Sequence, residues 1–309
     1  MPTRSGSLRL FKLAGITVYL HWTWFLVAVY AVQFRTGVYS SHFWNVLEYG
    51  SLFLIVLLHE FGHQLACRSV GGATHDIVLW PLGGVAYVTP PQRPGAQLWS
   101  IAAGPLVNVA LIPVLTLFLL LLGGYPSLRG IEPNEPAYLL NNIWLINLGL
   151  LIFNLMPIYP LDGGQILRSL LWFVLGRANS LLVASVVGFV GVAGLILLVL
   201  LWHSLWLGVM AVFILMNCWG GLTQARALAR IARLPRRNGF LCPVCRVAPP
   251  AGAVWRCGQC GRAFDPFETL GTCPHCSASY AAMSCPECGS LRPLAEWERC
   301  GQVPPVIDV

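Results

Sequence analysis

Long runs without a charged side chain dominate the first two thirds of this sequence. Residues 178–225 contain no Asp, Glu, Lys or Arg. A membrane-spanning helix needs about 20 consecutive apolar residues, so this stretch is long enough for two spans. Only 10% of the 309 residues are charged, against roughly 25% in soluble proteins. We therefore expect an all-α polytopic membrane protein with a small soluble part.

The apolar runs predict about six membrane-spanning helices. Their approximate positions are residues 13–34, 46–67, 98–122 and 138–158, and two spans between 178 and 225 that turn at Trp202-His203-Ser204. Residues 71–95 lie between the second and third spans and are too short and too rich in Gly and Pro to cross a membrane. They predict a β-hairpin or a re-entrant loop.

Basic residues mark both ends of this membrane part. Arg4, Arg9 and Lys12 precede the first run, and the last run is followed by Arg226, Arg230, Arg233, Arg236 and Arg237. Basic loops stay on the cytoplasmic side, and six spans return the chain to its starting side. We expect both termini in the cytoplasm of a cell-membrane protein. The net charge of +7 fits this orientation and gives no reason to expect nucleic acid binding. The first apolar run is too long, and lacks the cleavage site, for a signal peptide.

The second apolar run ends in His59-Glu60-Phe61-Gly62-His63. Two histidines four residues apart lie on one face of a helix, where both imidazoles can bind one metal ion. Ionisable side chains inside a membrane are costly and mark functional sites. The HExxH pattern predicts a zinc hydrolase, with Glu60 placed as the general base for water.

A catalytic zinc usually has three protein ligands and one open position. Asp162 is the expected third ligand, because it ends a neighbouring run beside Gly163-Gly164. In the six-span topology the second and fourth spans run in the same direction, so His63 and Asp162 lie at similar depth. The alternative is that Asp162 only caps the helix that follows it.

These two segments resemble the paired signatures of the site-2 proteases, a family of intramembrane zinc proteases. The second signature corresponds to residues 154–164, Asn-Leu-Met-Pro-Ile-Tyr-Pro-Leu-Asp-Gly-Gly. The resemblance implies zinc ligation by His59, His63 and Asp162, general-base catalysis by Glu60, and substrate binding in the cleft by Asn154. It covers approximately residues 10–225, including Ala103-Gly104-Pro105-Leu106-Val107-Asn108, where Asn108 has the plainer interpretation of a helix-packing residue.

The end of the chain carries a different metal-binding pattern. Nine of the eleven cysteines follow residue 240, and eight of them form four C-x-x-C pairs: Cys242/Cys245, Cys257/Cys260, Cys273/Cys276 and Cys285/Cys288. This spacing predicts a double zinc ribbon with two structural zinc ions, each bound by four cysteines. Pairing of consecutive C-x-x-C motifs is the simplest arrangement, although the sequence leaves an exchange between them open.

The sequence therefore divides into a six-span protease domain (1–225), an Arg-rich juxtamembrane linker (226–240), a cytosolic double zinc ribbon (241–300) and a tail (301–309). The leading hypothesis is an intramembrane zinc endopeptidase that cuts transmembrane segments near the cytoplasmic face. Its expected partners are a transmembrane protein substrate, the lipid bilayer and a regulatory protein at the ribbons. The alternative is a non-catalytic membrane adaptor, which has no need of Glu60. The sequence disfavours a transporter, because a transporter would need polar residues along several spans.

Overall fold

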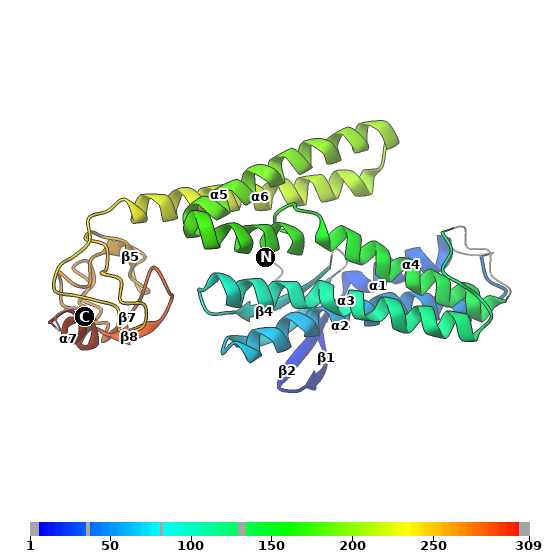
Figure 1. Ribbon diagram of the computed structural model, residues 1–309, viewed down its shortest axis with the longest axis horizontal. Coiled ribbons are helices and arrows are strands. Elements are labelled where there is room, and N and C mark those ends of the chain that lie inside the picture. Colours follow the sequence, from blue (N-terminus) through cyan, green and yellow to red (C-terminus); the bar gives the residue numbers. More distant parts are fainter. Residues whose placement is uncertain (1–5, 35–37, 81–82, 129–133, 303–309) are drawn as a thin grey trace, which may run out of the picture.

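The computed structural model describes residues 6–34, 38–80, 83–128 and 134–302 of the chain. Its main body is a bundle of long helices (Figure 1). Five of the described helices are long and apolar enough to cross a membrane: α2 (His42–Ser69), α3 (Pro94–Leu121), α4 (Glu135–Leu155), α5 (Asp162–Trp202) and α6 (Leu205–Ala232). The prediction of a polytopic helical membrane protein is confirmed.

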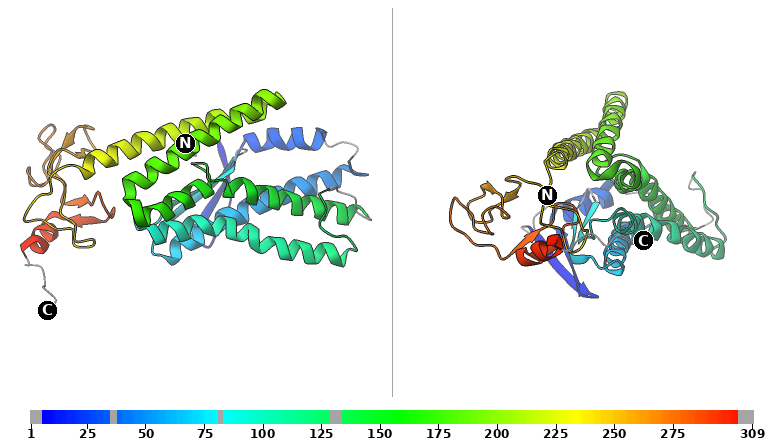
Figure 2. Two further views of the ribbon diagram at one scale, coloured as in Figure 1. Left: turned by 45° about the horizontal axis from the view of Figure 1, so that its top comes forward. Right: turned by 60° about the vertical axis from the view of Figure 1, so that its left-hand side comes forward.

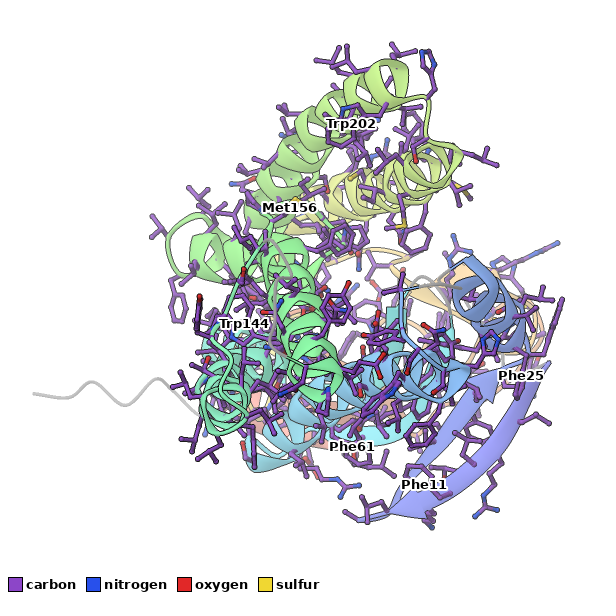
Figure 3. The ribbon with its side chains drawn as sticks, turned by 90° about the vertical axis from the view of Figure 1, so that its right-hand side faces the viewer. Phe11, Phe25, Phe61, Trp144, Met156 and Trp202 are labelled. Atoms are coloured by element: carbon purple, nitrogen blue, oxygen red, sulfur yellow. The ribbon has the colours of Figure 1, made fainter. Side chains whose placement is uncertain are left out.

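The outer surface of the bundle is apolar, as a lipid-facing surface must be. Side chains project outward around the helices, for example near Trp202 and Phe25 (Figure 3). Val190, Leu200 and Trp202 are each more than 60% exposed. Such exposure of large apolar groups is unfavourable in water but favourable in hydrocarbon. The chain is a multi-pass integral membrane protein.

The longest helix, α5, is interrupted. Gly176 has φ 74° and ψ 174°, a conformation that only glycine adopts readily, so α5 consists of a first part (162–175) and a second part (177–202). The second part and α6 form an antiparallel hairpin that is visible in two views (Figures 1 and 2). Its turn lies at His203 and Ser204, as the sequence predicts.

The first predicted span is wrong. Residues 13–34 do not form one helix: the chain makes β1 (Ser7–Leu13), β2 (Ile16–His21) and then the 12-residue helix α1 (Thr23–Phe34). Twelve residues rise about 18 Å, short of the ~30 Å of a bilayer core. The run is uncharged because Ile16 and Val18 alternate into a buried face. An apolar strand and an apolar helix look alike to a hydropathy average.

The predicted β-hairpin is confirmed as β3 (Ala73–Trp80) and β4 (Gly83–Thr89). The strands form one sheet in the order β1-β2-β3-β4, with β2 and β3 parallel. Ile77 and Leu79 pack with Phe61 of α2 in one buried cluster. The sheet therefore lies directly against the segment that carries the histidine pair, and β4 is its edge strand.

A small cysteine-rich unit follows α6 (Figure 1). It contains β5 (Trp255–Arg256), β6 (Ala263–Phe264), β7 (Ala282–Ser284), β8 (Leu291–Pro293) and α7 (Leu294–Gln302). The aromatic side chains of Trp255, Phe267 and Trp297 pack edge to face at its centre. A core this small cannot stabilise a fold of this length alone, which makes bound metal the expected source of stability.

Candidate active site

Two helices bring three metal-binding side chains together. His59 and His63 lie on α2 and are 6% and 9% exposed; their Nε2 atoms are 3.1 Å apart. Asp162 is the first residue of α5. Its Oδ2 atom lies 3.0 Å from His59 Nε2 and 3.4 Å from His63 Nε2.

The spacing of these donor atoms fits a zinc ion. Zinc–nitrogen and zinc–oxygen bonds are about 2.0–2.2 Å long, so two ligands of a tetrahedral zinc lie about 3.3 Å apart. The three observed separations of 3.0, 3.1 and 3.4 Å agree with this value. Three converging donors leave one tetrahedral position for water or substrate. The site can therefore bind a metal in the manner of a catalytic zinc.

Both histidines are oriented through their other ring nitrogen. His59 Nδ1 donates a hydrogen bond to Asn108 Oδ1 at 2.6 Å, and His63 Nδ1 donates one to the Ser100 carbonyl at 2.9 Å. With Nδ1 protonated, the lone pair of each Nε2 points into the site. Such partners fix the tautomer and the ring orientation of metal-binding histidines.

Asn108 is held in turn by α4. Its Nδ2 donates to Asn147 Oδ1, and Asn147 Nδ2 donates to the Asn108 carbonyl, both at 2.9 Å; both residues are fully buried. The sequence favoured a packing role for Asn108, and its bond to His59 was missed. The available signal was an uncharged polar residue in each of two apolar spans, since such residues are costly in a membrane.

Glycine allows α3 to approach the histidines closely. A Cβ atom on Gly104 would lie 2.3 Å from His63 Nε2 and 2.7 Å from His59 Nε2. A Cβ on Gly62, between the histidines, would lie 2.7 Å from the Ala103 carbonyl. Any larger residue at these positions would push α2 and α3 apart.

The predicted general base, Glu60, lies on α2, and the predicted substrate-binding residue, Asn154, lies on α4. Glu60 is 6% exposed on α2, adjacent in sequence to His59. Asn154 lies in the last turn of α4 and is partly exposed. Among the described residues, no hydrogen bond joins the Asn154 side chain to His59, His63 or Asp162.

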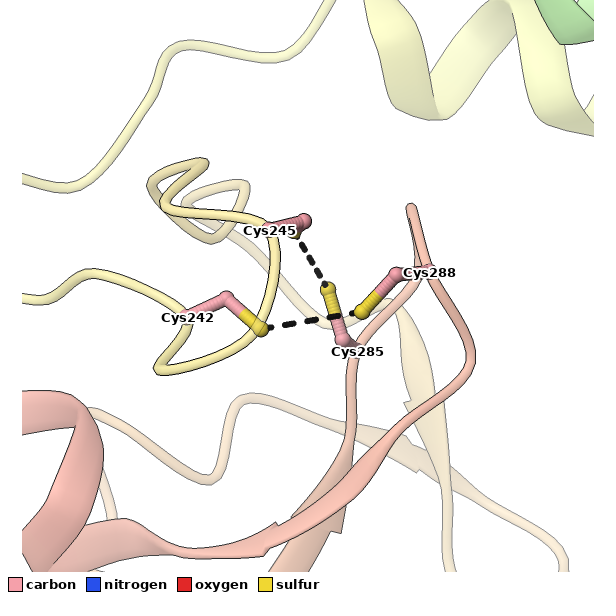
Figure 4. Close-up of side chains that lie close together, drawn as sticks. All are labelled: Cys242, Cys245, Cys285 and Cys288. Atoms are coloured by element: carbon pink, nitrogen blue, oxygen red, sulfur yellow. Dashed lines mark hydrogen bonds between the residues drawn. The ribbon is translucent and has the colours of Figure 1, made fainter. Parts of the chain in front are cut away.

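The cysteine-rich unit holds two groups of four sulfur atoms. The outer tetrad is formed by Cys242, Cys245, Cys285 and Cys288 (Figure 4), and the inner tetrad by Cys257, Cys260, Cys273 and Cys276. Neighbouring sulfurs are 3.5 to 3.8 Å apart. Sulfur ligands of a tetrahedral zinc, with bonds of about 2.3 Å, are separated by about 3.8 Å. Both tetrads can bind metal.

The simplest pairing, of consecutive C-x-x-C motifs, is wrong: the first motif pairs with the fourth and the second with the third. Packing explains the nested order. The antiparallel β7–β8 hairpin flanks the Cys285–Cys288 motif, and Trp255 Nε1 donates to the Ser284 carbonyl at 3.0 Å. Leu241 N, next to the first motif, donates to the Trp297 carbonyl of α7 at 3.0 Å. Because α7 begins directly after β8, this contact holds the first motif beside the fourth. The entropy cost of closing the longer loop grows only slowly with its length.

Backbone amides prepare one thiol of each tetrad for metal binding. The N–H groups of Cys260 and Gln259, together with the Tyr280 hydroxyl, lower the pKa of Cys257 to about 6. Burial raises the pKa of Cys242, but the N–H groups of Cys245 and Val244 outweigh it and bring the value to about 7. The metal-binding form of cysteine is the thiolate, so these contacts favour metal binding near neutral pH.

Comparison with known proteins agrees with this geometry. The model of peptidase family M50 matches residues 49–198. A zinc metalloprotease of Methanocaldococcus jannaschii is 33% identical over 73% of this chain and 62% of its own length. A relative from Synechocystis is 32% identical, with 60% and 49% covered. This chain therefore spans less than two thirds of these relatives.

Among solved structures, a site-2 protease from Methanocaldococcus jannaschii is 32% identical. The match covers 70% of this chain and 95% of that one, with a TM-score of 0.52. The family match includes the helices that carry the histidine pair and Asp162. The chain belongs to peptidase family M50, the family of the site-2 proteases.

Proposed function

We propose that this protein is an intramembrane zinc endopeptidase that cuts transmembrane segments of other membrane proteins. The observation that carries the proposal is the convergence of His59, His63 and Asp162 within a bundle of membrane-spanning helices. In this proposal the three side chains bind one catalytic zinc, and the two tetrads bind two structural zinc ions. The basic end of α6 and the ribbon unit are placed in the cytoplasm, on the side where the substrate is cut. The N-terminal strands are placed on the same side, because β2 pairs with β3 just after the end of α2.

The mechanism assigns separate tasks to the residues of the site. When bound, zinc supplies Lewis acidity, which makes water more acidic and polarises a peptide carbonyl. Glu60 accepts the proton of the attacking water and passes it to the leaving amine. Ser100 and Asn108 keep the imidazoles aligned throughout the cycle. Burial of the site in the bundle limits the entry of other water molecules.

Substrate must reach this site in an extended form, because the amides of a helix are shielded by its own turns. β4 is an outer strand of the four-stranded sheet, and an extended segment can add to such a strand through backbone hydrogen bonds. Asn154, at the end of α4, is assigned a role in holding that segment. Substitution of Gly83 and Gly84 by proline tests this part: the proposed role requires a large loss of cleavage, and undiminished cleavage contradicts it.

The central test compares wild type with Glu60→Gln in the full-length protein, using a panel of single-span membrane proteins as substrates. The substitution removes the base but leaves the three metal ligands. We expect both proteins to bind about three zinc ions, and the variant to cut about 10²–10⁴-fold more slowly. Asp162→Ala, the matched ligand variant, should lose one zinc ion as well.

Two outcomes contradict the proposal. Equal cleavage by wild type and Glu60→Gln would remove Glu60 from the mechanism. A wild-type protein that binds only the two tetrad zinc ions and cuts nothing would instead favour the adaptor function, with the ribbon unit as the site of partner binding.

A further inference from the structure

The loop that precedes Asp162 is anchored on the α5–α6 hairpin. Residues 156–161 connect α4 to α5. Within this loop, the Tyr159 carbonyl accepts a hydrogen bond from Cys218 Sγ of α6 at 3.0 Å. Ile158 and Tyr159 pack on a buried cluster formed by Val192, Ile214 and Cys218. The third metal ligand is therefore attached to the α5–α6 hairpin, whereas the histidines are attached to α2 and α3.

Glycines make the space for this loop. A Cβ on Gly188 would lie 2.5 Å from Cys218 Sγ and 3.3 Å from the Tyr159 carbonyl oxygen. A Cβ on Gly191 would lie 2.6 Å from Ile158 Cδ1. On α6, a Cβ on Gly221 would lie 2.6 Å from Ser185 Oγ and 3.1 Å from the Tyr159 ring. We call Gly188, Gly191, Cys218 and Gly221 the α5–α6 notch.

Nearby glycines on the same helices have no such neighbours. A Cβ on Gly194 of α5 or on Gly220 of α6 would meet no atom within 4 Å. Glycine is therefore needed only locally along this hairpin. At Gly188 and Gly221 it allows both the close packing of α5 on α6 and the entry of the loop, whereas Gly191 faces only Ile158 of the loop.

The notch is connected to Asp162 by a short and tightly packed segment. Leu161 N donates to the Ile158 carbonyl at 2.8 Å, and Gln165 Nε2 donates to the Pro160 carbonyl at 2.9 Å. A Cβ on Gly164 would lie 2.4 Å from Tyr159 N. Because Tyr159 is close to Asp162 in the chain and little space surrounds the segment between them, a shift of Tyr159 is passed to the carboxylate. Metal–ligand distances tolerate only about 0.2 Å.

We propose that the α5–α6 notch positions Asp162, so that the seating of Ile158 and Tyr159 sets the metal affinity of the catalytic site. The four notch residues are then positioning residues. They act on the site through the loop without touching the metal ligands. This inference rests on the proposed function, because it takes Asp162 to be a zinc ligand.

The experiment uses matched pairs in the full-length protein: Gly191→Val beside Gly194→Val, and Gly221→Val beside Gly220→Val. Each pair adds the same side chain to the same helix, but only the first member meets the loop, at Ile158 or at Tyr159. Gly221 also meets Ser185 of α5, so the Gly191 pair is the more specific of the two. Bound zinc is measured against increasing chelator, and the two tetrad zinc ions serve as an internal reference. We expect the notch variants to hold the third zinc about 10–100-fold more weakly, the range seen when the outer contacts of metal ligands are removed.

Three further measurements complete the test. Excess zinc should restore cleavage by the notch variants. If Gly191→Val does not accumulate, Gly191→Ala beside Gly194→Ala asks the same question with one methyl group. Cys218→Ser keeps a donor to Tyr159 and should retain more of the third zinc than Cys218→Val.

Defined outcomes overturn the inference. It fails if the notch variants hold the third zinc as tightly as their controls, or if the tetrad zinc ions are lost with the third. A wild-type protein without a third zinc, or Asp162→Ala with an unchanged third zinc, would instead overturn the proposed function on which it rests.

Discussion

The two kinds of metal-binding region in this chain are built in opposite ways. The His59, His63 and Asp162 donors sit on long helices that have their own packing, and both histidines are oriented by neighbouring polar groups. The tetrad sulfurs sit in loops, and the strands of their unit are only two or three residues long. The first region is shaped before metal arrives, whereas the second has little besides metal to hold it. The difference predicts a chemical role for the first metal and a structural role for the other two.

Complete metal removal should produce the largest contrast between the two regions. A structural zinc site supplies about 10–16 kcal/mol of apparent binding free energy to folding, while the helices keep their packing in lipid or detergent. We expect chelator to make the cysteine-rich unit sensitive to trypsin at Arg256 and Arg262, with the helical circular dichroism signal almost unchanged. Unfolding of the helices, or survival of the metal-free unit, would contradict the contrast.

The nested pairing of cysteines gives a sharp stoichiometric prediction. Cys242→Ser with Cys288→Ser alters only the outer tetrad and should remove one tetrad zinc. Cys242→Ser with Cys257→Ser alters both tetrads and should remove both. Pairing of consecutive motifs predicts the reverse, so zinc content measured on the two double variants decides between the arrangements. The inner tetrad in the first variant is the reference for intact folding.

The same contrast shows which features the sequence could predict. The helices α2 to α6 follow from long apolar runs, and the meeting of His63 with Asp162 follows from two spans that run in the same direction. These predictions need only periodicity and length. The strand at Ile16–His21 was missed because a buried strand and a span are both apolar and uncharged.

Other features depend on tertiary contacts that leave no local pattern. The pairing of the tetrads depends on contacts between distant segments, such as the hydrogen bond from Leu241 N to the Trp297 carbonyl. The acceptor for His63 is the backbone carbonyl of Ser100, which any residue could supply. The Asn108 side chain was visible in the sequence, but its partner was not.

A substitution of Asn108 tests whether the histidines of the catalytic site are oriented before metal binds. Asn108→Leu should leave His59 Nδ1 without its acceptor and Asn147 Oδ1 without its donor. We expect about 10–100-fold weaker binding of the third zinc. Asn217→Leu is the control, because Asn217 Nδ2 bonds to the Phe213 carbonyl of its own helix. An unchanged zinc affinity in Asn108→Leu would mean that α2 alone orients the imidazole.

The smallest predicted effect concerns the contact that joins the two regions. Arg177, next to the break in α5, donates to the carbonyls of Pro286 and Glu287 at 2.9 and 3.3 Å, and the Glu287 carboxylate pairs with Arg236 at 2.7 Å. The loop of the outer tetrad thus contacts α5, the helix that begins with Asp162. A cavity of about 500 Å³ remains beside this contact. Its lining includes Arg93, Trp172, Arg177, Val244, Cys245 and Glu287.

The ion pair is about one third exposed on each side, so its contribution should be below about 1 kcal/mol and should fall with added salt. We expect Glu287→Gln to raise hydrogen exchange at the 285–290 segment by less than about fivefold at low salt and hardly at all at high salt. Glu298→Gln, at an exposed position of α7, is the control. A larger effect that salt screens would mean that the Arg236–Glu287 charge pair, rather than the backbone contacts of Arg177, holds the cysteine-rich unit against the helices.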